Sequence, residues 1–252
     1  MTTPYYYYSK LPAGGDASSQ TTVLFSHVDF SPQGLPVLAR EVAQRKPEIV
    51  ALVGRANELE IAREALPEYP AVLESESPNR ADNAERVLVL SKLEIGPESK
   101  TSLGIEALPA LFLSMRSVRG DKLLFGVLDL LPADSQQDFF KSKVTSRRMA
   151  TLMRYAPESR IVVGNFAATP FSPIVAMYTR QVRLRSVMFG HGLFRTFDTT
   201  DPLVRLTLDN AFVSKDLRVV SFEMISGVSA RRRSFVFTVN HASVAGANSA
   251  TS

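Results

Sequence analysis

The stretch IVVGNFAATPFSP, residues 161–173, decides the fold of this 252-residue chain. An apolar run typical of a buried strand breaks at Gly164, the polar Asn165 and the small Ala167 follow, and a Thr-Pro pair turns the chain towards a short helix. Strands of α/β proteins deliver functional side chains to the edge of a sheet in this way. Taken alone, the stretch also fits an ordinary connection between a strand and a helix.

Similar patterns continue on both sides of this stretch. Short apolar or β-branched runs predict strands at residues 21–25, 48–53, 71–75, 86–91, 109–116, 122–128, 160–163, 204–213, 217–225 and 233–239. Apolar residues at helical spacing predict helices at 35–45, 56–65 and 134–155. In the last helix we expect Phe139, Phe140, Val144 and Met149 to face the core, and we expect Phe166 and Phe171 to be core residues as well. Many strand runs are apolar on both faces, which predicts sheets covered by helices in an α/β layered fold.

Composition indicates one folded domain with flexible ends. We expect a leader or linker at 1–20, a domain at 21–240 and a flexible tail at 241–252. Cysteine is absent, which excludes a thiol nucleophile, a cysteine zinc site and disulfides. The longest strongly apolar stretch, Ala107 to Met115, is too short to cross a bilayer.

The order of five motifs resembles the endonuclease/exonuclease/phosphatase family. Residues 164–170, GNFAATP, resemble the family signature G-D-F-N-A-T-P. The other four segments are similar to P-D-V-V-A-L, L-L-S-K/R, I-D-H-I-F-V-S and R-P-V-V-A-T, and they are KPEIVAL (46–52), VLSK (89–92), LDNAFVS (208–214) and RSFVFT (233–238). The resemblance implies a four-layer α/β sandwich, with two mixed sheets face to face and helices outside. It also implies a metal-dependent phosphodiesterase site at the edges of the sheets.

The resemblance fails at the residues that carry this chemistry. The family's metal-binding glutamate falls on Gly54, and the aspartate and asparagine of the signature fall on Asn165 and Ala167. The closing S-D-H motif falls on Ala230, Arg231 and Arg232. An amide is a poor partner for a cation, a methyl group does no polar work, and arginine cannot act as a base. We therefore expect a degenerate former active site without a metal or cofactor, at Gly54, Asp129, Asn165, Ala167, Asp209, Arg231 and Arg232.

Three positions leave room for a different interpretation. By the resemblance, His27 stands where the family has an asparagine, Asp129 stands where it has a histidine, and Asp209 is the retained acid of I-D-H. Asp209 could equally be structural, accepting hydrogen bonds from a neighbouring strand. A diverged metal-dependent phosphoesterase with a relocated site would need all three side chains to converge within about one ligand shell.

The charge distribution favours an anionic partner. Residues 1–140 carry 13 Lys and Arg against 19 Asp and Glu, whereas residues 141–233 carry 16 against 6. A basic surface that merely balances the acidic half is the simpler explanation. The functional interpretation is an anion-binding patch made by Arg231, Arg232, Arg183 and Arg185.

The sequence therefore predicts a catalytically inactive binding or scaffolding module whose partner is an anionic ligand or a protein. The alternatives are the relocated phosphoesterase and a nucleic-acid-binding module. His191, flanked by glycines, is expected in a loop. We expect a bacterial protein, either cytoplasmic or held outside the cytoplasm by an anchor beyond these residues, since membrane attachment would need further sequence.

Overall fold

The computed structural model describes residues 20–29, 33–75, 84–104, 107–117, 120–169, 171–188, 196–198 and 205–241. The expected leader, apart from Gln20, lies outside these residues, as do the loop with His191 and the tail after His241. No helix in these ranges is both long and apolar enough to span a bilayer.

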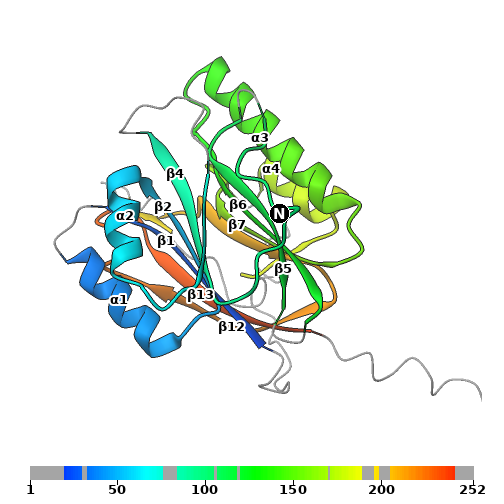
Figure 1. Cartoon of the computed structure of the whole chain (residues 1–252). Coiled ribbons are helices and arrows are strands. Elements are labelled where there is room, and N and C mark those ends of the chain that lie inside the picture. The colour runs from blue at the N-terminus through cyan, green and yellow to red at the C-terminus, as the bar shows by residue number, and fades with distance from the viewer. Residues whose placement is uncertain are drawn as a thin grey trace, which may run out of the picture.

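Two mixed sheets form the centre of the molecule (Figure 1). The first has the order β12-β13-β1-β2-β4-β3, with β1 at Gln20–His27, β2 at Ile49–Arg55, β3 at Ala71–Glu74, β4 at Glu85–Ser91, β12 at Leu217–Ile225 and β13 at Ser234–His241. The second has the order β5-β6-β7-β11-β8, with β5 at Ala110–Arg116, β6 at Lys122–Asp129, β7 at Ser159–Asn165, β8 at Arg185–Ser186 and β11 at Asp209–Val213. A separate pair joins β9 (Phe197–Asp198) to β10 (Arg205–Leu206).

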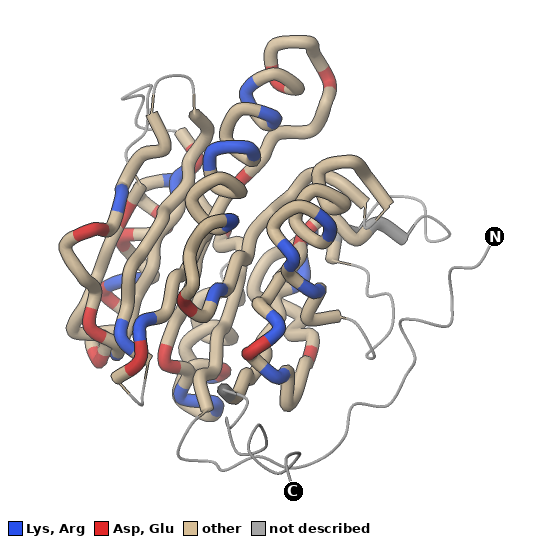
Figure 2. Tube along the Cα trace, turned by 90° about the vertical axis from the view of Figure 1, so that its right-hand side faces the viewer, with Lys and Arg blue, Asp and Glu red and all other residues tan. Residues whose placement is uncertain are grey.

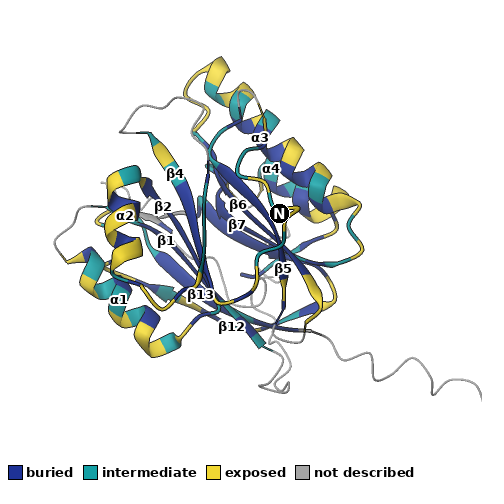
Figure 3. Cartoon of the chain, in the orientation of Figure 1, coloured by how far each residue is buried: buried dark blue, intermediate teal, exposed yellow. Residues whose placement is uncertain are grey.

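The alternation of side chains along the strands produces the layers. Val23 and Phe25 of β1 lie in a core between the two sheets, whereas Leu24 lies in a second core with Leu38 and Val42. Helices α1 (Gly34–Arg45) and α2 (Ala56–Glu64) thus cover the outer face of the first sheet. The outer face of the second sheet packs in the same way against α3 (Gln136–Arg154), α4 (Pro173–Ala176) and the π-helix η3 (Met177–Gln181). The predicted helix-covered sandwich is confirmed, and Figure 3 shows its buried strands between partly exposed helices.

Two predictions about individual strands are wrong. The strand at 160–163 does not end at Gly164 but continues to Asn165, because a backbone with φ of +151° lets the glycine pass close to β6. A Cβ there would lie 2.0 Å from the Leu128 carbonyl oxygen, which no other residue could tolerate. The strand predicted at 204–213 is divided into β10 and β11, because the Leu208 N–H donates to Thr196 Oγ1 and its carbonyl accepts from Phe166.

Three of the phenylalanines expected in the core are exposed. Phe139 is 49% exposed, Phe140 54% and Phe171 63%, whereas Phe166 is fully buried. The buried face of α3 consists mainly of small or flexible side chains, at Ser142, Thr145, Ser146, Met149, Ala150 and Met153. This face packs closely on the sheet, because a Cβ at Gly126 of β6 would lie 2.7 Å from Met149 Sδ. Of the remaining predictions for α3, Met149 is buried and Val144 is half-buried.

Candidate functional site

The ends of four strands bring polar side chains to one edge of the sandwich. Asp129 ends β6 and Asn165 ends the parallel strand β7, and the two residues are paired in the register. Asp209 begins β11, which is antiparallel to β7, and pairs with Asn165 from the other side. His27 ends β1 in the opposite sheet and contacts Asp209. The structure therefore brings together the positions that the motifs indicated.

A buried ion-paired cluster joins the two sheets. His27 Nε2 lies 2.9 Å from Asp209 Oδ1, and Arg232 Nη1 lies 3.2 Å from His27 Nε2 and 3.5 Å from Asp209 Oδ1. The Asp209 side chain is fully buried, that of His27 is 8% exposed and that of Arg232 is 23% exposed. Asp209 Oδ2 is also buried and has no hydrogen-bond partner among the described residues.

The role of His27 Nε2 in this cluster depends on the tautomer of the ring. A guanidinium can only donate, and a carboxylate can only accept. With a proton on Nε2, His27 donates to Asp209, and Arg232 donates to the same carboxylate. With the proton on Nδ1, Nε2 accepts from Arg232 instead, so in both tautomers this nitrogen has a partner inside the cluster.

A second pair of carboxyl groups lies beside this cluster. Burial raises the pKa of Asp129 well above its usual range, and the neighbouring Glu85 carboxylate raises it further. The Asn165 amide opposes this shift by donating to Asp129 Oδ1 at 2.9 Å and to the Leu130 carbonyl at 3.0 Å. Burial and Glu85 therefore both favour the protonated form of Asp129. Glu85, at the start of β4, is a member of the site that sequence reasoning missed, although it directly precedes a predicted strand.

Asn165 also shapes the loop that follows β7. Its Oδ1 accepts a hydrogen bond from the Ala167 N–H at 2.9 Å. Ala167 has a φ of +46°, in the left-handed region that alanine rarely adopts. The family signature has an asparagine at this position, and asparagine tolerates that backbone shape better.

The space beside Gly54 is filled by a neighbouring side chain. A Cβ added to Gly54 would lie 2.6 Å from Val28 Cγ2 and 3.1 Å from the Val28 carbonyl oxygen. The nearest carboxylate, Glu58, accepts a hydrogen bond from the Arg55 N–H at 2.8 Å and so caps α2. A side chain at position 54 would therefore require Val28 to move.

The donor set at this edge does not fit a magnesium ion, which needs several negatively charged oxygens. The pKa of Asp129 is raised, Asp209 is paired with Arg232, and position 54 offers no side chain. Throughout the described ranges, no three His, Asp or Glu side chains are arranged to hold a metal ion.

The four predicted arginines are not gathered in one patch. Arg232 lies in the buried cluster, and Arg231 beside it is exposed. Arg185 pairs with Val213, at the opposite end of β11 from Asp209, and donates to the Leu217 carbonyl. Arg183, exposed in the turn before β8, lies with Arg185 rather than with Arg232. Spacing along the chain could not reveal which end of the sheet these residues reach.

The sequence and the structure were each compared with known proteins. No protein-family model matches the sequence, and no curated protein matches it. Solved structures do match over most of the chain. A protein from Bacteroides vulgatus, described as an endonuclease/exonuclease/phosphatase, aligns with a TM-score of 0.72 and 12% sequence identity. The alignment covers 88% of this chain and 99% of that protein. The chain has the endonuclease/exonuclease/phosphatase fold.

Two further matches show how widely this fold varies in sequence. A humanised form of TDP2 from D. rerio aligns with a TM-score of 0.69 and 16% identity, covering 89% of this chain and 100% of its own. The catalytic domain of human Nocturnin, with bound sulfate, aligns with a TM-score of 0.68 and 14% identity, covering 96% of this chain and 100% of its own. These TM-scores establish a shared endonuclease/exonuclease/phosphatase fold. Because the sequence identities are low, the activity must be argued from the residues of the site.

Proposed function

We propose that this chain is a binding module with the endonuclease/exonuclease/phosphatase fold and without metal-dependent phosphodiesterase activity. The observation that carries the proposal is the packing of Val28 into the space beside Gly54. A second observation supports it: the Arg232 guanidinium contacts the Asp209 carboxylate, so a fixed positive charge already neutralises the retained acid.

The ligand of this module is an anionic group on a small molecule or on a protein. Arg231 is exposed beside the half-buried Arg232. The exposed Arg55 ends β2, and the neighbouring strand β1 ends in His27. Guanidinium groups bind phosphate, sulfate and carboxylate through paired hydrogen bonds. The structural match to Nocturnin with bound sulfate supports sulfate as a probe beside phosphate.

Metal binding is tested by calorimetric titration of the purified chain with Mn²⁺ and by thermal unfolding with and without millimolar Mg²⁺. The proposal expects no saturable Mn²⁺ binding and no rise in melting temperature. Saturable binding together with chelator-sensitive cleavage of a phosphodiester would refute it. Asp209→Asn would then identify whether the retained acid holds the ion.

Anion binding is tested by thermal unfolding with inorganic phosphate and sulfate at constant ionic strength. The proposal expects stabilisation by the anions that Arg231→Gln and Arg55→Gln each weaken. Lys215→Gln is the matched control, because Lys215 is exposed in the turn before β12. Equal stabilisation of all variants would show a general salt effect and would contradict a site at this edge.

A relocated phosphoesterase site is the second candidate. The contact of 2.9 Å between His27 and Asp209 favours it, since histidine–carboxylate pairs are common in acid–base catalysis. Nε2 faces the carboxylate, so such chemistry would have to use the other ring nitrogen. Hydrolysis of bis(p-nitrophenyl) phosphate that persists in chelator and disappears in His27→Asn would establish this function. Without such hydrolysis, the binding module is the better explanation.

A further inference from the structure

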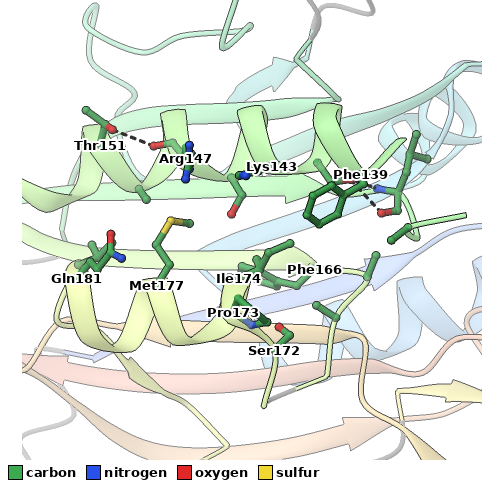
Figure 4. Close-up of a pocket in the computed structure, with 18 of the residues that line it drawn as sticks. Phe139, Lys143, Arg147, Thr151, Phe166, Ser172, Pro173, Ile174, Met177 and Gln181 are labelled. Carbon is green, nitrogen blue, oxygen red and sulfur yellow. Dashed lines mark hydrogen bonds between the residues drawn. The ribbon is translucent and has the colours of Figure 1, made fainter. Parts of the chain in front are cut away.

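A groove separates the two helical segments that cover the second sheet. Helix α3 forms one wall, and α4 with η3 forms the other (Figure 4). The groove has a volume of about 810 Å³, and Phe166 of the loop after β7 lies at its base. The His27 and Asp209 cluster does not line it, whereas Ala167 of the loop after β7 does, so the groove adjoins the strand-end edge without including its ion-paired cluster.

One row of α3 residues runs along the groove. Phe139, Lys143, Arg147, Thr151 and Arg154 recur every three or four positions, so they share one face of the helix. At a rise of about 1.5 Å per residue, the row extends over about 22 Å. In Figure 4, Lys143 and Arg147 lie on α3 opposite Ile174 and Met177 of the facing helical segment.

The groove is positively charged and contains no acid to balance that charge. Lys143, Arg147 and Arg154 line it, and no Asp or Glu does so. None of the three forms an ion pair with a described carboxylate. Lys143 instead lies 5.7 Å from the Phe139 ring centroid, and Arg154 lies 5.4 Å from that of Tyr155. Such cations beside aromatic rings remain available to an acidic ligand.

The apolar side chains beside these cations are of types common in protein interfaces. The exposed Phe139 stands at one end of the row, and Ile174 and Met177 form the opposite wall. Aromatic residues, methionine and arginine are enriched where proteins bind one another. Methionine also adapts its shape to a partner.

We infer that this groove binds an acidic amphipathic helix of a partner protein. The three cations are spread along about three turns of α3, which matches carboxylates repeated along a helix. A lipid with one anionic head group would need the positive charge at one end only. The terminal segments of this chain do not supply the helix, because residues 234–252 carry no charge and residues 1–20 carry one acid, Asp16, and one base, Lys10.

The test uses the purified chain and a panel of fluorescein-labelled helical peptides of about four turns. Each peptide has Leu at helical spacing on one face and Glu beside it, and two controls replace Glu by Lys or scramble the sequence. Fluorescence anisotropy should give a Kd of about 100 µM or tighter for at least one acidic peptide. The Lys peptide and the scrambled peptide should bind at least about tenfold more weakly.

Substitutions separate the groove from the overall charge of the protein. Lys143→Glu with Arg147→Glu should weaken binding of the acidic peptide by about tenfold or more, and Phe139→Ala should weaken it severalfold. Lys141→Glu is the control, because Lys141 is on the same helix and does not line the groove. Thermal unfolding of each variant verifies that it is folded.

Three outcomes would overturn the inference. The first is equal weakening by Lys141→Glu, which would mean that only net charge matters. The second is tight binding of lysophosphatidylglycerol that excludes the peptides, which would assign the groove to a lipid. The third is that no acidic peptide binds at protein concentrations up to about 100 µM.

Discussion

Replacing Gly54 by alanine should destabilise the protein because Val28 occupies the space that the new methyl group needs. The added Cβ would lie 2.6 Å from Val28 Cγ2, well inside van der Waals contact. Overpacking of this kind costs about 1–3 kcal/mol, whereas the loss of glycine flexibility in the unfolded chain returns about 0.4–1 kcal/mol. The net free energy of unfolding should therefore fall by about 1–2 kcal/mol, equivalent to about 2–8 °C in melting temperature.

A double-mutant cycle attributes this cost to Val28. In the background of Val28→Ala, the Cγ2 atom is absent, and Gly54→Ala should be nearly neutral. Urea unfolding of the four proteins should give a coupling energy of at least about 1 kcal/mol, since the two residues are in direct contact.

Two results would refute this reasoning. One is an alanine at position 54 that leaves stability unchanged, which would mean that Val28 moves aside freely. The other is the same cost in both backgrounds, which would place the clash on the Val28 carbonyl oxygen, 3.1 Å from the added Cβ. In either case, the side chain of Val28 would not be the reason that a metal-binding side chain is excluded.

Three further predictions concern the strand ends. Gly164→Ala should prevent folding, because its Cβ would lie 2.0 Å from the Leu128 carbonyl oxygen. Circular dichroism of the expressed protein should detect the loss of structure. Gly120→Ala is the control and should fold, because its Cβ would meet nothing within 4 Å. The raised pKa of Asp129 means that the folded state keeps a proton that the unfolded state loses above about pH 3.9, so this group's contribution to stability falls as pH rises towards its folded pKa. Urea midpoints between pH 4 and pH 8 should show that slope in the natural chain and not in Asp129→Asn, and identical slopes would contradict the assignment. Asp209→Ala should lower the free energy of unfolding by about 2–4 kcal/mol, because Arg232 and His27 would lose their shared acceptor. Asp134 is exposed, so Asp134→Ala should change the free energy of unfolding by less than about 0.5 kcal/mol in the same denaturation assay.

The fold could be predicted from the sequence because its strands carry strong local signals. Runs such as EIVALV at 48–53 and KLLFGVL at 122–128 are apolar on both faces, and each forms a central strand of a sheet. Motif order then indicated which strand ends meet, and His27, Asp129, Asn165 and Asp209 do lie together.

Details that depend on packing could not be predicted in this way. Helical spacing suggested an inward Phe139, but the groove between α3 and α4 leaves this side chain half exposed. The clash between Val28 and a Cβ at position 54 depends on where the loop after β1 crosses β2, which no local pattern reports. Arg183 and Arg185 are close to the signature in the sequence, yet β8 places them at the far end of β11.

Ala167 shows that the loop after β7 is formed by its surroundings rather than by its own preference. An alanine in the left-handed region gives up about 1–2 kcal/mol relative to an ordinary conformation. Two neighbouring bonds hold it there: Ala167 N–H donates to Asn165, and Phe166 N–H donates to the Leu208 carbonyl. The backbone at this position thus has a conformation that asparagine tolerates better than alanine. An amide side chain could therefore be introduced at position 167 without a change in the backbone.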